Sequence, residues 1–287
     1  MLAGGIVVAP GLLAACERTG TNGATEGGRL EELRSQGTIQ VGIAGEEPYG
    51  YLDGGDLTGM DPTVQQEIWG NLGIDEVQAT QVDFDGLIPG LNAGRFDVVA
   101  AGMFITPERC AEAAFSDPMY CAPNAFLVAP GNPLNITDFQ SIADADAKLV
   151  VLGGAVEGQY AQEAGVSGGN ITRVGGARDG LLQLEQGRVD AFGLTTITLK
   201  DILNKNPDSD VELTEAFTPV VDGEEQLGCG GAVFAQEDTA LVDAFNEELA
   251  NLRESGRLLE LIEPFGFGPE TQEDAERVTT EQLCGAG

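Results

Sequence analysis

The sequence contains no histidine, which excludes histidine-based catalysis, histidine-containing metal sites and pH switching driven by histidine. Basic residues are also scarce: fourteen Lys and Arg stand against forty-seven Asp and Glu, a formal net charge of −33. This charge excludes the basic surface typical of nucleic-acid-binding proteins. No CxxC spacing occurs, so a zinc site is not expected, and we predict neither a metal nor an organic cofactor.

The acidic residues are dispersed along the chain, which indicates a hydrated acidic surface. Such a surface suits a salty medium, because a short Debye length relieves the repulsion between carboxylates. An acidic face for a cationic partner is the alternative interpretation. The 42% share of apolar residues is sufficient for packed cores, and 287 residues are enough for two lobes.

Long apolar runs are missing, apart from a short one at the N-terminus. The segment LAGGIVVAPGLLAAC (2–16) is too short to span a bilayer comfortably, and its end, Leu-Ala-Ala-Cys, resembles the lipobox of bacterial lipoproteins. We therefore predict a signal peptide over 1–16, a lipid on Cys16 as the only membrane attachment, and a flexible tether over 17–29. No Lys or Arg precedes the apolar run, so an upstream start or a buried apolar strand is the alternative.

The remaining cysteines are even in number, which in an exported protein suggests two disulfides. They are Cys110, Cys121, Cys229 and Cys284. Of the three possible pairings we predict Cys110–Cys121 with Cys229–Cys284, because the first two bracket one short loop. A fully reduced chain is the alternative.

Extended and helical patterns alternate beyond the tether. TIQVGIAG (38–45) is typical of an apolar strand, and Asp61 with Pro62 suits the N-cap and first turn of a helix. The pattern L-x-x-G-R-x-D occurs at 91–97 and again at 184–190, each time ending a predicted helix and opening a strand. The match suggests two lobes built from the same helix–strand unit.

Two strands flanked by Gly and Pro, within 124–133 and 227–238, mark the places where the composition changes. We therefore expect an α/β fold of two lobes joined by two crossing strands that act as a hinge. The predicted lobe 1 comprises 30–127 and 232–287, and lobe 2 comprises 128–231. The cleft between the lobes is a preferred place for a ligand.

The sequence resembles a known family in five stretches: RSQGTIQVGI, GEEPYGYLD, LTGMDPTVQQEI, FDGLIPGLNAGRFDVVAAGMFITPERCAEAAFSDPMY and GRVDAFGL. Over about residues 30–270 they are similar to the polar-amino-acid class (family 3) of extracytoplasmic solute-binding proteins of ABC importers. AAGMFITPERC, YCAPNAFLV, GGAVEGQYAQEAGV and GCGGAVF are most similar to the ectoine/hydroxyectoine-binding members. The resemblance implies a type II periplasmic-binding-protein fold, a small zwitterionic ligand, an ABC permease as partner, and a monomer that works outside the cytoplasm.

Arg109 follows a predicted buried strand and can hold a carboxylate through two charge-assisted hydrogen bonds of its planar fork. In the family this arginine binds the ligand's α-carboxylate, and a Ser or Thr five residues earlier helps it. Phe104 occupies the helper's position here, so an aromatic wall replaces a polar contact. A salt bridge from Arg109 to a protein carboxylate is the alternative.

Thr195 stands where the family usually has an aspartate that binds the ligand's α-ammonium. Losing this aspartate as well as the helper hydroxyl argues against an ordinary α-amino acid. Glu46 and the rings of Tyr49, Phe84 and Phe104 remain for a cation, and such rings suit a delocalised charge. With the arginine, they predict a cyclic amidinium carboxylate such as ectoine or hydroxyectoine; glycine betaine and proline stay open.

The other candidates have two interpretations each. Gly102 would let its backbone approach the ligand, or it only ends a strand; Glu157 would meet the ligand at a helix start, or it only caps that helix. Glu47 could make the contact instead of Glu46, and the phenylalanines could be plain core residues. An enzyme such as the family's cyclohexadienyl dehydratases, with Glu46 or Glu157 as acid or base, is the functional alternative.

Overall fold

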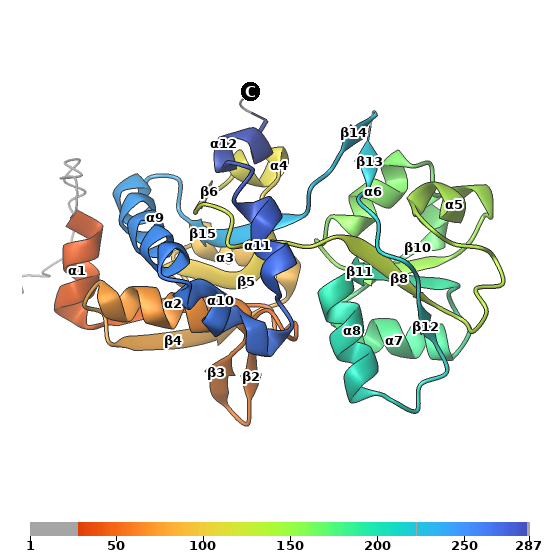
Figure 1. The fold of residues 1–287 in the computed structure, drawn as a ribbon, viewed down its shortest axis with the longest axis horizontal. Helices are drawn as coiled ribbons and strands as arrows, with labels where there is room; N and C mark the ends of the chain where they lie inside the picture. Colours follow the sequence, from red (N-terminus) through yellow and green to blue (C-terminus); the bar gives the residue numbers. More distant parts are fainter. Residues whose placement is uncertain (1–27, 222, 286–287) are drawn as a thin grey trace, which may run out of the picture.

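The computed structural model describes residues 28–221 and 223–285. The predicted signal peptide, Cys16 and nearly all of the tether lie outside the described residues. Two sheets, each flanked by helices, form two lobes connected by extended segments (Figure 1). The prediction of a two-lobed α/β fold is confirmed. No helix within the described ranges is long and apolar enough to cross a membrane.

The first lobe is built on a six-stranded sheet in which β7 also pairs with β15 and the other strands have the order β4-β1-β5-β15-β6. Its strands are β1 (Thr38–Ile43), β4 (Glu76–Gln81), β5 (Val98–Phe104), β6 (Ala114–Phe115), β7 (Tyr120–Cys121) and β15 (Cys229–Phe234), with a separate hairpin of β2 (Tyr51–Asp53) and β3 (Asp56–Thr58). Its helices are α1 (Gly28–Gln36), α2 (Met60–Asn71), η1 (Phe84–Gly86), α3 (Leu87–Asn92), α4 (Pro107–Cys110), α9 (Thr239–Glu254), α10 (Arg257–Ile262), η3 (Glu263–Phe265), α11 (Pro269–Ala275) and α12 (Thr280–Leu283).

The second lobe is built on a five-stranded sheet of order β10-β9-β11-β8-β12. Its strands are β8 (Asn124–Val128), β9 (Leu149–Leu152), β10 (Ile171–Val174), β11 (Ala191–Thr195) and β12 (Glu212–Leu213), followed by the small hairpin β13 (Val220–Val221) and β14 (Glu224–Glu225). Its helices are α5 (Phe139–Asp144), α6 (Glu157–Glu163), η2 (Gly168–Asn170), α7 (Ala177–Glu185) and α8 (Thr196–Lys205).

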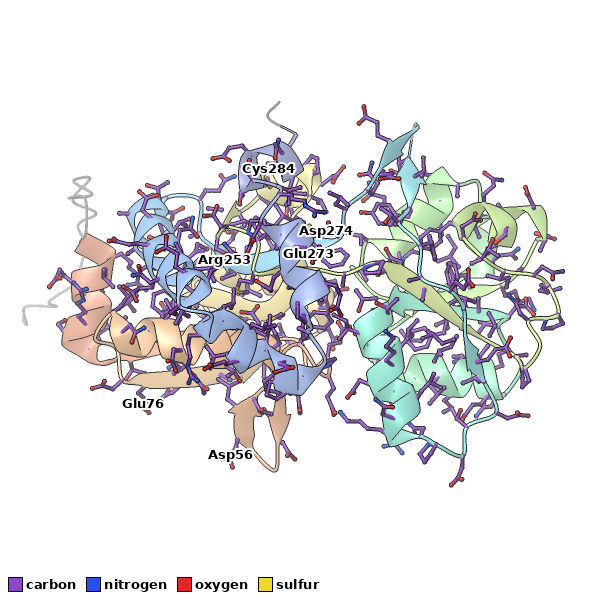
Figure 2. All side chains as sticks on the ribbon, viewed as in Figure 1. Asp56, Glu76, Arg253, Glu273, Asp274 and Cys284 are labelled. Carbon is purple, nitrogen blue, oxygen red and sulfur yellow. A yellow bond between two sulfur atoms is a disulfide. The ribbon has the colours of Figure 1, made fainter. Side chains whose placement is uncertain are left out.

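The core of each lobe lies between its sheet and its helices. Every residue of β5, β8, β9, β11 and β15 is buried, as expected for strands covered on both faces. Helix α9 buries Leu241, Phe245, Leu249 and Leu252 on one stripe against the first sheet. Charged side chains such as Asp56 and Glu76 project outwards (Figure 2), so many of the acidic residues lie on a hydrated surface.

The repeated L-x-x-G-R-x-D motif has the same local structure in both lobes. Its glycine has a positive φ in each copy, 67° after α3 and 61° after α7, which ends the helix. Its aspartate then receives a hydrogen bond from the neighbouring strand or loop: Asp97 from the Gln40 amide and Asp190 from the Lys148 amide, both at 2.8 Å. The motif therefore joins helix and strand in the same way twice.

The lobe boundaries predicted from the sequence are displaced by a few residues. Strand β8 begins at Asn124 and pairs with β11 and β12, so it belongs to the second sheet rather than to a lobe 1 that ends at 127. Strand β15 begins at Cys229 and pairs with β5, so it belongs to the first sheet rather than to a lobe 2 that ends at 231. Each of these strands begins after its crossing and pairs within the sheet of the lobe that the chain has just entered.

The predicted disulfide pairing is wrong. Cys110 is joined to Cys284, and Cys121 is joined to Cys229. Antiparallel pairing of β7 with β15 makes Cys121 and Cys229 register partners, with Cα atoms 4.0 Å apart. The chain after α4 runs along the first sheet instead of closing a small loop, which leaves Cys110 beside the end of α12.

The predicted role of Asp61 as an N-cap is also wrong. Helix α2 already begins at Met60, and the carboxyl of Asp61 is fully buried beneath β5. It accepts hydrogen bonds of 2.8 Å from the Gly102 amide and from Gln65 Nε2. Burial raises the pKa of Asp61 to about 6, although these hydrogen bonds lower it. Asp61 therefore supports the strand that carries part of the site.

Candidate functional site

One cavity between the two lobes contains all the side chains selected from the sequence as ligand contacts. Its free volume is about 30 Å³, far below the usual range for small-molecule sites, because the two lobes lie close together around it. The selected residues that line it are Glu46, Tyr49, Phe84, Gly102, Phe104, Arg109, Glu157 and Thr195. The first six come from loops, strand β5 and the short helices η1 and α4 of the first lobe, and the last two come from α6 and β11 of the second.

Arg109 reaches this cavity from the single turn of α4. Thr106 caps the turn by accepting a hydrogen bond from the Arg109 amide at 3.3 Å. The guanidinium donates to the carbonyl of Phe104 at 2.7 Å and, across the cleft, to that of Gly154 at 2.9 Å. Its carbon lies 5.4 Å from the centre of the Phe84 ring. Both hydrogen bonds go to backbone carbonyls rather than to a carboxylate, and burial lowers the pKa of Arg109.

Glu46, rather than Glu47, faces the cavity. Its Oε1 accepts a hydrogen bond of 2.8 Å from the hydroxyl of Thr198 in the other lobe. Burial raises the pKa of Glu46 to about 7; the hydrogen bond from Thr198 opposes this rise and the charge of Glu157 adds to it. Glu47 has a side chain that is 45% exposed and forms an ion pair with Lys205 at the rim.

The ring of Tyr49 packs directly against the backbone of Gly102. The ring of Tyr49 is buried, and a Cβ added at position 102 would lie 2.1 Å from its Cδ1. Gly102 also has a φ of 58°, a conformation that glycine adopts without steric cost. Its carbonyl accepts a hydrogen bond of 2.6 Å from the hydroxyl of Tyr120. In this structure Gly102 therefore lies within β5, two residues before its end, and makes room for the ring of Tyr49.

Phe104 and Thr195 occupy facing walls of the cavity. Phe104 is 6% exposed and packs 6.1 Å from the ring of Tyr120, so it serves both the core and the cavity. Thr195 caps α8 by accepting a hydrogen bond from the Thr198 amide. Its Oγ1 also accepts a hydrogen bond from the hydroxyl of Tyr49. The threonine hydroxyl is thus already engaged within the protein.

Glu157 brings a second carboxylate to the cavity as the first residue of α6. It is 3% exposed, and its Oε1 accepts a hydrogen bond of 2.8 Å from the Asn124 side chain. Burial raises its pKa, against the lowering effects of its own amide, of Arg109 and of Asn124. Two carboxylates and one guanidinium therefore share one small cavity with aromatic rings, an arrangement that can hold both charges of a zwitterion.

Some residues of the site were missed in the sequence. The cavity is also lined by Tyr120, Ala155, Val156 and Leu194, and its two carboxylates accept hydrogen bonds from Thr198 and Asn124. Tyr120 ends the SDPMY stretch that carries part of the family resemblance, so a signal was present there. No group of three or more potential Asp, Glu or Cys metal ligands occurs in 28–221 and 223–285.

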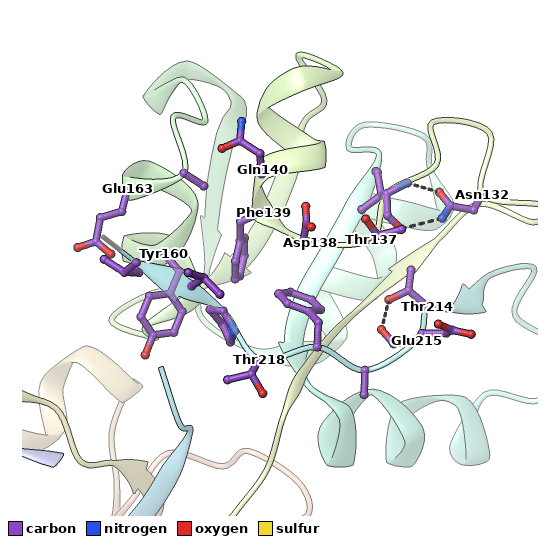
Figure 3. A pocket seen from close by; sticks show the side chains of 17 residues that line it. Asn132, Thr137, Asp138, Phe139, Gln140, Tyr160, Glu163, Thr214, Glu215 and Thr218 are labelled. Carbon is purple, nitrogen blue, oxygen red and sulfur yellow. Dashed lines mark hydrogen bonds between the residues drawn. The ribbon is translucent and has the colours of Figure 1, made fainter. Parts of the chain in front are cut away.

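A second, wider hollow lies within lobe 2 and includes none of the predicted ligand contacts (Figure 3). Its walls carry the rings of Phe139, Tyr160 and Phe217 and the acids Asp138 and Glu163. No Lys or Arg is among its described lining residues, so this hollow offers no cation to pair with a carboxylate. This hollow is therefore a weaker candidate than the interlobe cavity for a ligand that carries a carboxylate.

Comparisons with known proteins cover almost the whole described chain. Residues 39–269 match the family of bacterial extracellular solute-binding proteins, family 3. A protein of Sinorhizobium fredii described as a probable amino-acid ABC transporter periplasmic-binding protein is 34% identical over 259 residues, covering 89% of this chain and 85% of the relative. The lysine/arginine/ornithine-binding periplasmic protein of Escherichia coli is 32% identical over 208 residues, or 70% of this chain and 76% of the relative.

Two solved structures are similar over most of the fold. The crystal structure of EhuB in complex with hydroxyectoine is 39% identical, with a TM-score of 0.83, and the match covers 91% of this chain and 99% of that one. The ancestral amino-acid-binding protein AncCDT-1, a precursor of cyclohexadienyl dehydratase, is 26% identical, with a TM-score of 0.71 and coverages of 83% and 99%.

Proposed function

This chain belongs to the bacterial extracellular solute-binding proteins of family 3, and from that premise we propose that it captures ectoine or hydroxyectoine for an ABC importer. The predicted type II periplasmic-binding-protein fold is confirmed by the same similarities. One observation carries the choice of ligand: Arg109 and Glu46 line one cavity with the rings of Tyr49, Phe84 and Phe104.

The anionic half of the ligand would lie against Arg109. The guanidinium is enclosed between two lobes and contacts backbone carbonyls of both. A ligand carboxylate would supply the negative charge that these carbonyls lack, through short charge-assisted hydrogen bonds. Because the site is buried, such bonds are screened much less by salt than those on the surface.

The cationic half would lie between Glu46 and the aromatic rings. A delocalised amidinium gains about 0.5–2 kcal/mol from each well-placed ring, and a carboxylate accepts its N–H groups. Phe104 provides no hydroxyl. Thr195 provides no charge, and its hydroxyl oxygen already accepts a hydrogen bond from Tyr49. These features support a cyclic amidinium over a primary ammonium.

An α-amino acid is the second candidate, favoured by the relatives from S. fredii and E. coli. Glu46 and Glu157 could both accept hydrogen bonds from an α-ammonium. The two candidates are separated by calorimetry and by a thermal-shift panel of compatible solutes and amino acids, since a bound ligand raises the melting temperature. We expect both ectoines to bind more tightly than any α-amino acid.

We infer that the protein binds its ligand without chemical turnover. Thr198 and Asn124 hold the carboxylates of Glu46 and Glu157, the two groups that could act as acid or base. The similarity to AncCDT-1 is the observation that favours an enzyme. Incubation of the purified protein with prephenate or arogenate tests this, and product formation would overturn the inference.

Delivery takes place outside the cytoplasm, where this family works. We further propose that a lipid on Cys16 anchors the chain to the membrane, and that the protein acts as a monomer when it meets the permease. The basis for the anchor is the Leu-Ala-Ala-Cys sequence at 13–16. Mass spectrometry of the native protein tests it: an unmodified Cys16 with residues 1–15 retained contradicts the anchor.

A further inference from the structure

The last residues of the chain lie beside the turn that carries Arg109. The family match ends at residue 269, and the chain continues through α11 and α12. Helix α12 lies next to α4 (Figure 1), and Cys284, which follows it, is joined to Cys110 (Figure 2). Cys110 is the residue directly after Arg109, so a segment beyond the family match is covalently linked to the candidate site.

This C-terminal segment (270–285) is firmly attached to the first lobe. Gln272 donates a hydrogen bond to the carbonyl of Met119 at 2.8 Å, and Thr280 donates one to that of Ser116 at 2.9 Å. Thr279 and Gln282 form a reciprocal capping box that begins α12. The segment can therefore act as a fixed support.

The turn that carries Arg109 is a single short helical turn. Helix α4 has four residues; Pro107 and Glu108 are exposed, and Arg109 and Cys110 are partly buried. So short a helix is marginal in water, and segments with few buried contacts open locally. Its backbone is held by the Thr106 cap at 3.3 Å and by a bond of 2.8 Å from Gln236 to the carbonyl of Ala111. The guanidinium itself donates hydrogen bonds to carbonyls, that of Phe104 in its own lobe and that of Gly154 across the cleft. The disulfide joins this weak turn to the fixed segment.

We propose that the C-terminal segment is a covalent strap that positions Arg109. Through the Cys110–Cys284 bond it holds the backbone of α4, so the guanidinium is presented to the cavity in one place. Cys110 and Cys284 are positioning residues, because neither lines the cavity. The proposal rests on the proposed function in so far as Arg109 binds the ligand's carboxylate. A preorganised arginine binds more tightly because less order is lost on binding.

Hydrogen exchange tests the strap without any ligand. In the double variant Cys110→Ser/Cys284→Ser, we expect the amides of 109–111 to exchange at least about tenfold faster, with strands β5 and β11 unchanged. The matched control is Thr280→Ala, which removes a hydrogen bond of the same segment and keeps the disulfide; its α4 amides should stay within about twofold of the wild type. Unchanged exchange in the double variant overturns the proposal.

Calorimetry with hydroxyectoine then tests whether the strap acts through Arg109. We expect the double serine variant to bind about tenfold more weakly than the wild type. In an Arg109→Lys background, loss of the disulfide should change affinity less than about twofold, because the forked contact is already absent. An equal loss in both backgrounds overturns the positioning role. If the wild type binds neither ectoine, the proposed ligand fails, while the exchange measurement still decides whether the strap exists.

Discussion

The hydroxyl of Tyr49 donates a hydrogen bond of 3.0 Å to Oγ1 of Thr195, joining two residues that are 146 positions apart and belong to different lobes. Beside it, Thr198 donates to Glu46 at 2.8 Å. Both bonds lie at the cavity, so the residues that we propose to contact the ligand also hold the lobes together. A ligand that binds between them favours the closed form over the open one.

Arg109→Ala should weaken ectoine binding more than any other single change in the cavity. It leaves the ligand carboxylate enclosed without its partner, a loss of about 2–5 kcal/mol. Phe104→Ala is the matched comparison, and removing one ring contact should cost about 0.5–2 kcal/mol. Titration calorimetry on both variants measures the difference. A smaller effect for Arg109→Ala than for Phe104→Ala would contradict the assignment of the carboxylate to Arg109.

Ligand choice should change when the polar pair typical of the family is restored. Phe104→Ser together with Thr195→Asp should shift preference from ectoines towards α-amino acids, because a carboxylate and a hydroxyl then face a primary ammonium. Thr195→Ser, which keeps the hydroxyl that Tyr49 bonds, is the control and should retain the preference for ectoines. Calorimetry with glutamine, arginine and both ectoines checks this. A wild type that prefers an α-amino acid would refute our interpretation of Phe104 and Thr195.

Affinity should rise with pH because a bound cation favours ionised Glu46. Burial raises the pKa of Glu46 to about 7, so below this pH the ligand must displace a proton. We expect tighter binding from about pH 6 to 8, with proton release visible as a buffer-dependent calorimetric enthalpy. Glu46→Gln should flatten the profile, whereas Glu157→Gln, which alters the other cavity carboxyl, should retain most of it. A wild-type affinity independent of pH contradicts a buried, protonated Glu46.

The same carboxyl has a defined effect on folding. Its folded pKa lies above the reference value of 4.5, so the folded state holds the proton more tightly than the unfolded chain. The contribution of Glu46 to stability is therefore greatest below about pH 4.5 and is lost as the pH rises through about 7. Chemical denaturation without ligand measures the free energy of unfolding at each pH. Between about pH 4.5 and 7 it should fall less in Glu46→Gln than in the wild type. An equal fall in the wild type and the variant would contradict this effect of Glu46 on folding.

The ion pairs at the rim of the cleft should stabilise the closed form only slightly, and only at low salt. Lys205 forms ion pairs with Glu47 across the cleft and with Asp201 on its own helix, and all three side chains are partly exposed. Lys205→Ala should weaken ligand binding by about 0.2–1 kcal/mol, and the difference should vanish at 1 M salt, where the Debye length is ~3 Å. Asp201→Ala keeps the cross-cleft pair and serves as the control. A persistent loss at high salt would indicate a buried contact instead.

Much of the site could be predicted from the sequence because its signals are local. Arg109 follows directly after a strand and a Thr-Pro pair, and each copy of L-x-x-G-R-x-D leads from a helix to a strand. Phe104 and Thr195 each stand at the carboxyl end of a strand, one in each sheet, where ligands of open α/β sheets commonly bind. Alternation and glycine stops therefore indicated the fold class, whereas most of the predicted cavity residues came from the resemblance to the family.

Only the tertiary structure decided which distant groups meet. The Cys121–Cys229 disulfide depends on the register of β7 with β15, which the spacing of cysteines in the sequence does not reveal. Asp61 is drawn inward because the Gly102 amide needs a buried acceptor, although its sequence neighbours resemble a cap. Glu46 and Glu47 are adjacent in the chain, yet their carboxyls have different surroundings. That of Glu46 faces the cavity and contacts Thr198 of the other lobe, whereas that of Glu47 lies at the rim. Such outcomes depend on long-range packing, in which residues far apart in sequence compete for the same space and the same hydrogen bonds.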